Sequence, residues 1–422
     1  MDTNDHKLTR DEFLGQARKF LEGLVAARSD RNVDRAAEPT LEKADRIALF
    51  SGSSSDEVQA AVEYQRALYD AGYGWISGPV EDGGAGYPVS YEKAFAGLER
   101  GFAIPSKAPL SVSLGMVAPT VAQFGSPETK QRWLRALRRA DAIGCQLFSE
   151  PAAGSDLAAV QTRAVRDGDE WVLNGQKVWT SGAHYSDVGI ALTRTSNGSR
   201  HRNLTVFAVD MHAPGVEVRP LRQMTGGADF NEVFLVDVRV PDTDRLGEVD
   251  GGWKVAMAML MHERGAIGGS SSGGSGVFRM DDLAQWLHDI DRADDDAVAQ
   301  AFAKVYCGVT AAKAMRARAD ANLRANGVPG PEMSLGKLAL TANLSALSDL
   351  VALALGPRLI ADNGDHRTFA WSEFVLGVPG MRIGGGTDEI HRDTIANRVL
   401  GLPKESMARP AAVAKDTGDK EF

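Results

Sequence analysis

Two stretches near the middle of the chain, CQLFSEPAAGSD at 145–156 and NGQKVWTSG at 174–182, carry the most information about fold and function. The first places small and hydroxyl-bearing residues at the end of a strand-like run, and the second places Trp179 beside two hydroxyl groups. A planar redox cofactor needs an aromatic wall and hydrogen-bond donors aimed at its heteroatoms. These stretches could supply both, although a tryptophan on a strand is more often a core residue and Ser-x-Pro is more often a turn.

The sequence around these stretches, from about Gly144 to Pro241, has the pattern of β-structure. β-Branched and aromatic residues alternate with polar ones, as in 170–173 and 204–209. Hairpins are predicted at three dipeptides that tolerate the positive φ of tight turns: Asp167-Gly168, Asn174-Gly175 and Asn197-Gly198. A sheet or small barrel of roughly 100 residues follows from this pattern.

The segments on both sides of the β-region have helical periodicity. Apolar residues recur at three- and four-residue spacing before it, and the runs 298–321 and 334–355 continue the pattern after it. This order predicts an α+β fold with an α-helical N-terminal domain, a β-barrel or sheet as middle domain and a C-terminal helical bundle. The predicted boundaries are 1–140, 141–250 and 251–402, followed by a polar tail at 403–422.

Four arginines share one helical face near the end of the first helical region: Arg132, Arg135, Arg138 and Arg139. Such a charged stripe is usually a solvated helix face, and we expect that here. An anion-binding or nucleic-acid-binding site is the alternative.

The composition excludes several classes of protein. Lys plus Arg total 47 against 56 Asp plus Glu, a net charge of −9, and 43% of residues are hydrophobic, which argues against disorder and against a general attraction to nucleic acid or anionic membranes. Cys145 and Cys307 lie far apart without metal-ligand spacing, so neither a disulfide framework nor a metal site is predicted.

The chain shows no targeting pattern that we recognise. Its first ten residues are polar and lack the apolar core of a secretory signal, so a cytoplasmic location is expected. The longest apolar stretch, 338–361, is interrupted by polar residues, which favours a buried bundle helix over a membrane span.

Generic catalytic motifs are absent, and one glycine-rich loop remains. No nucleophile elbow, Walker loop or His-Glu-x-x-His zinc helix occurs. The run 384–387, Gly-Gly-Gly-Thr, opens a predicted helix, but Asp388 and Glu389 follow in its first turn and would repel a phosphate. The glycines would instead let the backbone approach a flat or bulky ligand, with an ordinary turn as the alternative.

In combination, these segments resemble the acyl-CoA dehydrogenase family. The similar stretches are LFSEPAAGSD at 147–156, NGQKVWTSG at 174–182, GGTDEIHRDTIANRVLG at 385–401, FGSPETKQRWL at 124–134 and GGWKVAMAMLMHERGAIG at 251–268. The resemblance implies a helical N-terminal domain, a β middle domain and a C-terminal four-helix bundle. It also implies FAD as cofactor and formation of an α,β double bond in an acyl-CoA thioester.

The resemblance assigns FAD contacts to residues in three segments. These are Phe148, Ser149, Ser155, Trp179, Ser181, Thr387, Asp388 and Glu389. Among them, Trp179 would cover one flavin face, Ser181 would reach the N5 edge, and Ser155 would also lie near the CoA arm of the substrate.

The catalytic base departs from the common family pattern. Many members carry it as the Glu of Tyr-Glu-Gly-Thr, but here 384–387 has no carboxylate. Some members instead place the Glu on the first bundle helix, directly before an Arg, and the matching pair is Glu263-Arg264. Glu263 would then abstract the α-proton while flavin N5 takes the β-hydride. Arg264, Gly385 and Gly386 would contact substrate, the Gly385 N–H polarising the thioester carbonyl.

Two further family segments are missing, which bears on partners. The Arg-x-x-Phe-Gly and Gln-x-x-Gly-Gly segments that contact the neighbouring FAD are not found; 352–356 reads ALALG instead. The adenine end of FAD would then depend on another chain, in a homo-oligomer or a heterotetramer with a related chain, with an electron-transfer flavoprotein as electron acceptor. A non-catalytic or half-site subunit and a related flavin oxidase are the alternatives. The glycines at 384–386 and on the 251–268 helix suggest a branched or ring-bearing acyl group.

Overall fold

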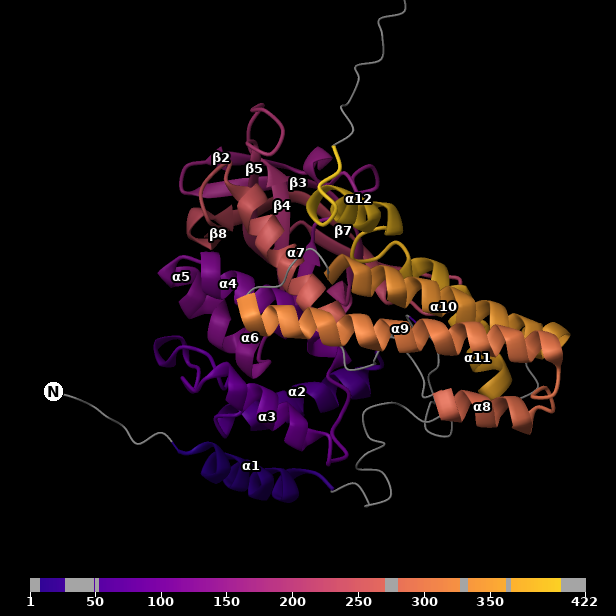
Figure 1. Cartoon of the computed structure of the whole chain (residues 1–422). Helices are drawn as coiled ribbons and strands as arrows, with labels where there is room; N and C mark the ends of the chain where they lie inside the picture. Colours follow the sequence, from indigo (N-terminus) through magenta and orange to yellow (C-terminus); the bar gives the residue numbers. More distant parts are fainter. Residues whose placement is uncertain are drawn as a thin grey trace, which may run out of the picture.

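The computed structural model describes residues 8–26, 49, 53–269, 280–326, 333–361 and 366–403 of the 422-residue chain. Within these ranges, the side chains of 263–269, 320, 322–326, 333 and 366–370 lie outside the description. Helices come first, a sheet follows, and helices complete the chain (Figure 1). The predicted fold class is confirmed, whereas the exact domain boundaries stay predictions.

The N-terminal part consists of short helices around an aromatic core that includes Phe13, Tyr64 and Phe95. Capping boxes begin the first two: Thr9 with Glu12, and Ser54 with Glu57. The helices are α1 (Arg10–Leu24), α2 (Ser55–Asp70), η2 (Val80–Asp82), α3 (Val89–Glu99), η3 (Ala108–Leu110), η4 (Ser113–Val117), α4 (Ala118–Phe124), α5 (Pro127–Thr129), η5 (Lys130–Leu134) and α6 (Arg135–Arg139).

The arginine stripe on η5 and α6 is only partly the solvated face that was expected, because Arg132 and Arg135 are exposed while Arg138 and Arg139 are part-buried. Arg132 pairs with Asp244 at 2.8 Å and with Asp210 at 2.9 Å. Arg139 pairs with Asp70 and Asp141, and the guanidinium of Arg138 lies 4.2 Å from the centroid of the Trp75 ring. Only Arg135 is a simple exposed position.

The middle part is one eight-stranded sheet in the order β6-β7-β3-β2-β4-β5-β8, with β1 paired to β4. Its strands are β1 (Gly144–Leu147), β2 (Arg163–Asp167), β3 (Glu170–Ser181), β4 (Val188–Arg194), β5 (Leu204–Asp210), β6 (Val216–Leu221), β7 (Phe230–Pro241) and β8 (Arg245–Leu246). The hairpins predicted at Asp167-Gly168 and Asn197-Gly198 join β2 to β3 and β4 to β5.

The hairpin predicted at Asn174-Gly175 was wrong. Both residues lie inside β3, where the pairing with β7 shifts register between Leu173 and Gly175. A Cβ on Gly175 would come within 2.7 Å of the Thr162 backbone, so this glycine serves a close approach between two segments and not a turn.

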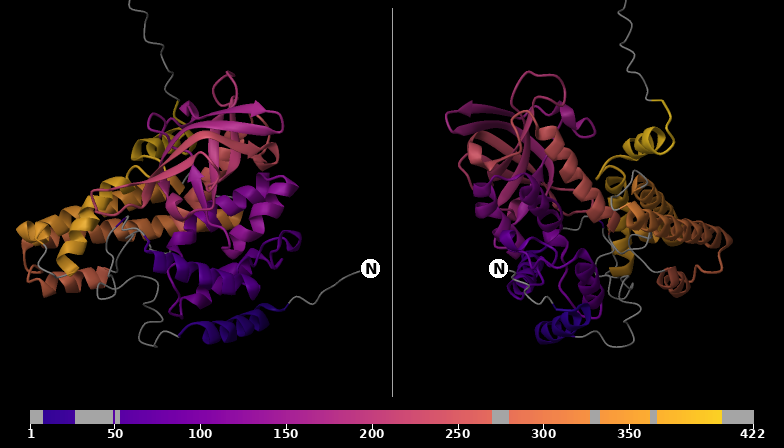
Figure 2. Two further views of the ribbon diagram at one scale, coloured as in Figure 1. Left: turned by 180° about the vertical axis from the view of Figure 1, so that it is seen from behind. Right: turned by 60° about the vertical axis from the view of Figure 1, so that its left-hand side comes forward.

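The C-terminal part is helical and has its own core, which includes Trp286, Leu350 and Trp371. It contains α7 (Gly252–Gly269), α8 (Met280–Asp289), α9 (Asp296–Asn326), α10 (Met333–Leu355), η9 (Gly356–Ile360), α11 (His366–Met381) and α12 (Asp388–Arg398). α10 packs between α9, α11 and α12. Figure 2 shows α9 to α11 extending to one side of the sheet, which is stacked on the N-terminal helices.

The apolar segment of α10 is less polar than the sequence analysis assumed. Residues Ser334–Ile360 contain an 18-residue window of mean hydropathy 1.7, and 44% of that window is buried, so the segment is long and apolar enough to cross a membrane by those criteria alone. A core helix passes the same test, and Leu344, Leu347 and Leu350 of α10 are buried in the bundle core. It is the one such helix in the part of the chain that the structure describes.

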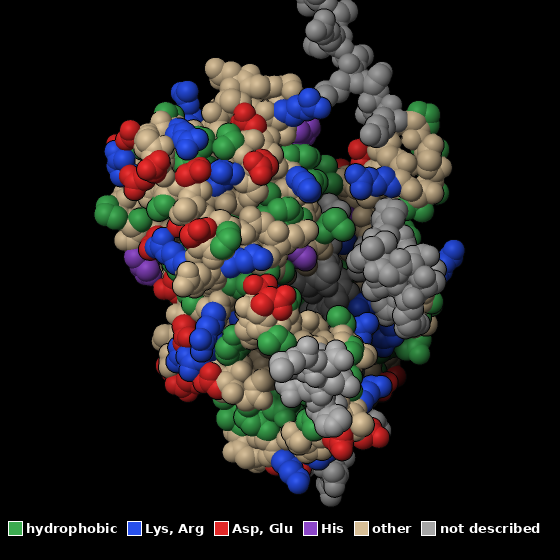
Figure 3. Space-filling model, turned by 90° about the vertical axis from the view of Figure 1, so that its left-hand side faces the viewer, with side chains coloured by type: hydrophobic (Ala, Val, Ile, Leu, Met, Phe, Trp, Pro, Cys, Tyr) green, Lys and Arg blue, Asp and Glu red, His purple; other side chains and the backbone are tan. Residues whose placement is uncertain are grey.

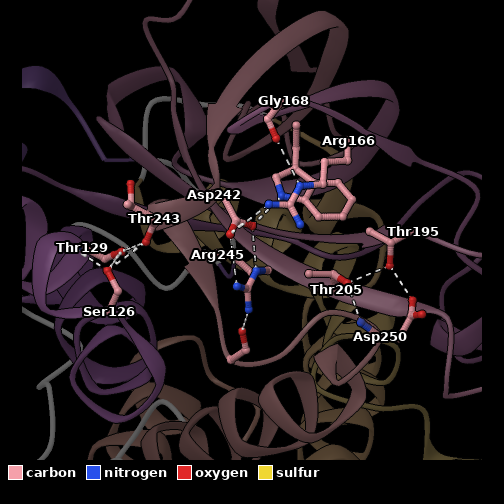
Figure 4. A network of polar contacts seen from close by, with 12 residues as sticks. Ser126, Thr129, Arg166, Gly168, Thr195, Thr205, Asp242, Thr243, Arg245 and Asp250 are labelled. Atoms are coloured by element: carbon pink, nitrogen blue, oxygen red, sulfur yellow. Dashed lines mark hydrogen bonds and ion pairs between the residues drawn. The ribbon is translucent and has the colours of Figure 1, made fainter.

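Polar contacts fasten the sheet to helices on both sides (Figure 4). The Thr243 carbonyl accepts hydrogen bonds from Ser126, at 2.9 Å, and from Thr129, both beside α5. Thr195, directly after β4, donates to Asp250 at 2.7 Å, and the Asp250 N–H donates to the hydroxyl of Thr205 at 2.9 Å. The start of α7 is therefore held against the β4–β5 hairpin.

Candidate active site

The loop that follows β1 lies directly against β3. Phe148 is buried, Ser149 is part-buried, and the Ser149 carbonyl accepts from the Val178 N–H at 2.9 Å. Ser155, farther along the loop, is exposed. The structure thus brings the 147–156 segment beside 174–182, as two segments that share one ligand require.

A buried ion pair, which the sequence analysis missed, holds these two segments together. Lys177 of β3 is fully buried and donates to Glu150 at 2.8 Å, to the Leu192 carbonyl at 2.6 Å and to the Phe148 carbonyl at 3.3 Å. Glu150 also accepts the N–H groups of Gln161 and Thr162. The ammonium and the carboxylate each have several hydrogen-bond partners within the chain.

The two charges of this pair influence each other's protonation. Burial lowers the pKa of Lys177 to about 8, although the attraction of Glu150 opposes the shift. Burial alone would raise the pKa of Glu150, but Lys177 and the N–H donors outweigh it, so that pKa lies below its usual range. Both groups are therefore charged at neutral pH.

Trp179 stands out from the rest of β3 in backbone and in exposure. Its φ is +60°, and the pairing with β7 shifts register between Lys177 and Thr180. The left-handed conformation costs an L-residue about 1–2 kcal/mol. In this conformation the indole is 60% exposed and lies edge-on to Phe230, with the ring centroids 6.0 Å apart. Ser181, two residues later, is also exposed.

Unpaired polar atoms lie next to this residue. Thr180 and Asn231 face each other across β3 and β7 and are both buried, with the Asn231 amide donating to the Thr180 carbonyl at 2.9 Å. The Thr180 hydroxyl and the Asn231 amide oxygen have no hydrogen-bond partner among the described residues. An exposed aromatic ring, an exposed hydroxyl and orphaned polar atoms together fit a polar, planar ligand at this edge of the sheet.

The second group of candidate residues surrounds the glycine loop before α12. Thr387 is the N-cap of α12 and accepts from the Ile390 N–H at 3.3 Å. Asp388 is buried and accepts from Thr341 at 2.9 Å and from Arg382 at 2.8 Å, so its carboxylate is engaged inside the domain. Burial would raise the pKa of Asp388, but these donors hold it below its usual range. Glu389 is exposed.

The loop itself is held by two side chains that the sequence analysis missed. Lys337 of α10 donates to the Met381 carbonyl at 2.7 Å and to the Gly384 carbonyl at 2.5 Å. His391 of α12 lies 3.1 Å from the Gly385 carbonyl. Gly385 and Gly386 have φ of +69° and +96°, values that favour glycine. The loop is thus fixed between α10 and α12.

Two candidate residues lie on α7 but outside the described side chains. Glu263 and Arg264 follow His262 on this helix, so the roles expected for their side chains stay predictions. α7 packs against η4, α4, β5 and α10, with Met259 buried in the central core. Among the described residues, no hydrogen bond joins the 147–182 group to the 384–389 group.

Comparison with known proteins settles the family. Three acyl-CoA dehydrogenase family models match in order: the N-terminal domain at 31–141, the middle domain at 145–238 and the C-terminal domain at 250–400. The acyl-CoA dehydrogenase IpdE1 of Mycobacterium tuberculosis is 36% identical over 348 residues, which cover 81% of this chain and 88% of that protein. The chain belongs to the acyl-CoA dehydrogenase family. This acyl-CoA dehydrogenase is therefore an oxidoreductase acting on acyl-CoA, and FAD is the cofactor of its family.

Solved structures agree with this assignment. The Tcur3481-Tcur3483 steroid ACAD and the ChsE4-ChsE5 complex of Mycobacterium tuberculosis each match with a TM-score of 0.70 and 25% sequence identity. Each match covers 96% of this acyl-CoA dehydrogenase and 100% of the other chain.

Proposed function

We propose that this chain catalyses FAD-dependent α,β-dehydrogenation of an acyl-CoA thioester. Within the family assignment, the observation that carries the proposal is Trp179, an exposed indole kept in a strained left-handed conformation beside an exposed Ser181. Strain of this kind persists where the surrounding structure enforces it, and it concentrates at ligand sites.

The chain's residues fit a flavin at this edge of the sheet. Phe148, Ser149 and Ser155 would line it from the loop, Trp179 and Ser181 from β3, and Thr387 to Glu389 from the C-terminal domain. FAD, when bound, would supply the hydride acceptor. Asp388 would act through the loop that it stabilises, because its carboxylate is already engaged by Thr341 and Arg382.

Glu263 is the proposed base for the α-proton. A carboxylate near the α-carbon works as a base when an apolar, water-poor site raises its pKa toward neutrality. The Gly385 N–H has no hydrogen-bond acceptor among the described residues and would donate to the thioester carbonyl, which makes the α-proton more acidic. Arg264 would contact the same substrate.

The test of the base is Glu263→Gln in the FAD-loaded protein. We expect flavin binding to persist and flavin reduction by acyl-CoA to fall by about 10²-fold or more, because one proton acceptor is lost. Glu248→Gln, an exposed carboxylate just before α7, is the matched control and should reduce at the wild-type rate. Equal reduction rates for wild type and Glu263→Gln would exclude Glu263 as the base.

A half-site subunit is the second candidate, favoured by a specific observation. One similar structure is a complex of two named chains, ChsE4-ChsE5, and two segments that complete the neighbouring FAD site in many family members are missing here. Purification of the chain alone separates the candidates. Yellow protein that acyl-CoA bleaches supports the dehydrogenase, colourless protein supports the half-site subunit, and rapid peroxide formation supports a flavin oxidase. An electron-transfer flavoprotein as acceptor and a cytoplasmic location remain proposals.

A further inference from the structure

The guanidinium of Arg138, at the end of α6, is partly withdrawn from water and has no anionic partner among the described residues. Its Nε is fully buried and has no hydrogen-bond partner, and its Nη1 makes one long bond of 3.4 Å to the Leu114 carbonyl. No carboxylate of the described residues lies within 4.0 Å of it. The neighbouring Arg139, in contrast, has two carboxylate partners.

The charge of Arg138 persists at neutral pH. Burial lowers its pKa to about 10, while the attraction of Glu92 and Tyr69 works against the shift. Glu92 of α3 supplies part of this attraction, and its Oε1 accepts the N–H of Ser77 at 3.0 Å and the Ser77 hydroxyl at 2.8 Å.

A second unpaired nitrogen comes from α7. The Nε2 of His262 is buried and has no hydrogen-bond partner. Burial and the nearby charge of Arg138 together lower the pKa of His262, so its ring is neutral at neutral pH. A neutral imidazole can donate one hydrogen bond from a ring nitrogen. Arg138 contacts the Leu114 carbonyl of η4, and η4 packs against α7, so both unpaired groups lie where the N-terminal helices meet α7.

The position of this region matters for the proposed reaction. Glu263, the proposed base, directly follows His262 on α7, and η4, whose Leu114 carbonyl contacts Arg138, packs against the same helix. If Glu263 is the base, an acyl group that presents its α-carbon to it lies at α7, the helix that also carries His262.

Resting on the proposed function, we propose that Arg138 and His262 bind a carboxylate carried by the acyl group, so that the substrate is an acyl-CoA with a second, free carboxylate. A carboxylate would accept hydrogen bonds from the guanidinium fork and neutralise its charge. A hydrocarbon would leave that charge unpaired, which is unfavourable in a water-poor site.

The experiment uses the FAD-loaded enzyme and two ring-bearing acyl-CoA thioesters. They differ only at the ring carbon farthest from the thioester, where one carries a carboxylate and the other a methyl group. We expect wild type to favour the carboxylate substrate in kcat/KM, and Arg138→Met to lower the ratio of the two kcat/KM values by about tenfold or more, the size expected for a lost hydrogen bond to a charged group. Arg138→Lys should recover part of the ratio, and Arg135→Met, an exposed position on the same helix, should keep the wild-type ratio.

The outcomes separate this inference from the proposed function. A wild-type enzyme without preference for the carboxylate, or an Arg138→Met variant with an unchanged ratio, would overturn the inference while flavin reduction by the methyl substrate upholds the dehydrogenase. If neither thioester nor any straight-chain acyl-CoA reduces the flavin, the proposed function fails, and this inference fails with it.

Discussion

Lys177 and Arg138 are two cations withdrawn from water, and their surroundings differ. Lys177 has three hydrogen-bond acceptors, one of them the Glu150 carboxylate. Arg138 has one long bond, the face of Trp75 and a buried Nε without a partner. A charge that the chain satisfies itself belongs to the framework. A charge that the described residues leave unsatisfied is open to a ligand, as proposed for Arg138.

The energetics of buried charges support this distinction. Breaking a buried ion pair by removing one partner costs about 3–5 kcal/mol, because the other charge stays behind in a low-dielectric environment. Removing a buried charge that has no partner removes a desolvation penalty as well as a contact. The same substitution, cation to methionine, should therefore cost much stability at Lys177 and little at Arg138.

The largest effect is expected for Lys177→Met. Glu150 would stay buried without its cation, and the loop carrying Phe148 and Ser149 would lose its anchor to β3 and β4. We expect the free energy of unfolding, measured by urea titration with FAD in excess, to fall by about 3–5 kcal/mol. Lys19→Met, at an exposed position on α1, is the control and should change stability by less than about 0.5 kcal/mol.

The double variant Lys177→Met with Glu150→Gln shows whether the charge or the shape matters. A glutamine carries no charge, but its one amide oxygen can accept only one of the N–H groups of Gln161 and Thr162, which donate to different oxygens of Glu150, so only part of the lost stability should return. If the single and double variants are equally unstable, Lys177 acts through packing and not through its charge.

The sequence could predict the framework better than the site, for a physical reason. Helical periodicity and β alternation are averaged over many residues, so the helix, sheet, helix order followed from the pattern alone. The hairpin predicted at Asn174-Gly175 failed because the same dipeptide also allows close approach inside a strand, and only the neighbour Thr162 decides between these.

Some residues of the site lie where a strand is irregular, and the alternation of polar and apolar residues in the sequence does not reveal that irregularity. Strict alternation puts Lys177 and Trp179 on one face of β3, yet the structure buries the first and exposes the second, because the irregularity lies between Lys177 and Thr180. Family resemblance singled out Trp179, whose contact with the flavin stays a prediction, whereas the surroundings of Lys177, Arg138 and His262 show only in three dimensions.

The next largest effect is expected for substitutions of Trp179, whose indole is largely exposed. Trp179→Gly removes the aromatic face and also relieves the positive φ of +60°. We expect FAD affinity, measured by fluorescence titration, to fall about tenfold to a hundredfold, the size of a lost aromatic stacking contact. Trp179→Ala is the matched variant: it should lose the same affinity, but its apoprotein should be less stable than that of Trp179→Gly by about 1 kcal/mol. Unchanged FAD affinity in both variants would place the indole outside the flavin site.

Asp242, directly after β7, is a carboxylate with hydrogen-bond partners, and its lowered pKa predicts a pH dependence of the free energy of unfolding (Figure 4). Hydrogen bonds from Arg245 at 2.9 Å and from the Trp171 indole at 2.7 Å lower its pKa to about 2 from 3.8, Arg245 contributing most. Because the pKa is lower in the folded state, the stabilisation is present above about pH 4 and is lost as the pH falls toward 2. Asp242→Asn should therefore flatten the acid decline of the unfolding free energy by about 2 kcal/mol at most. Asp393→Asn, exposed on α12, should leave the decline unchanged.

One face of the molecule shows how acidic and basic side chains are distributed on its surface. On the face drawn in Figure 3, acidic and basic side chains are interspersed, without a large area of one sign. This face therefore gives no sign of a basic surface for nucleic acid, in keeping with the net charge of −9.

The smallest effect on the free energy of unfolding is expected for Arg138→Met, and this variant tests the comparison of Lys177 with Arg138 most directly. Methionine fills much of the same space, and the charge that burial penalises disappears. The losses are the contact with Trp75, worth about 0.5–1 kcal/mol, and a weak bond to Leu114. We expect the unfolding free energy of the ligand-free protein to change by less than about 1 kcal/mol. Arg132→Met is the matched variant, because it strands the buried Asp244 carboxylate and should cost about 1–3 kcal/mol. A loss at Arg138 as large as that at Lys177 would make Arg138 part of the framework, and the inference of a ligand carboxylate would lose its physical basis.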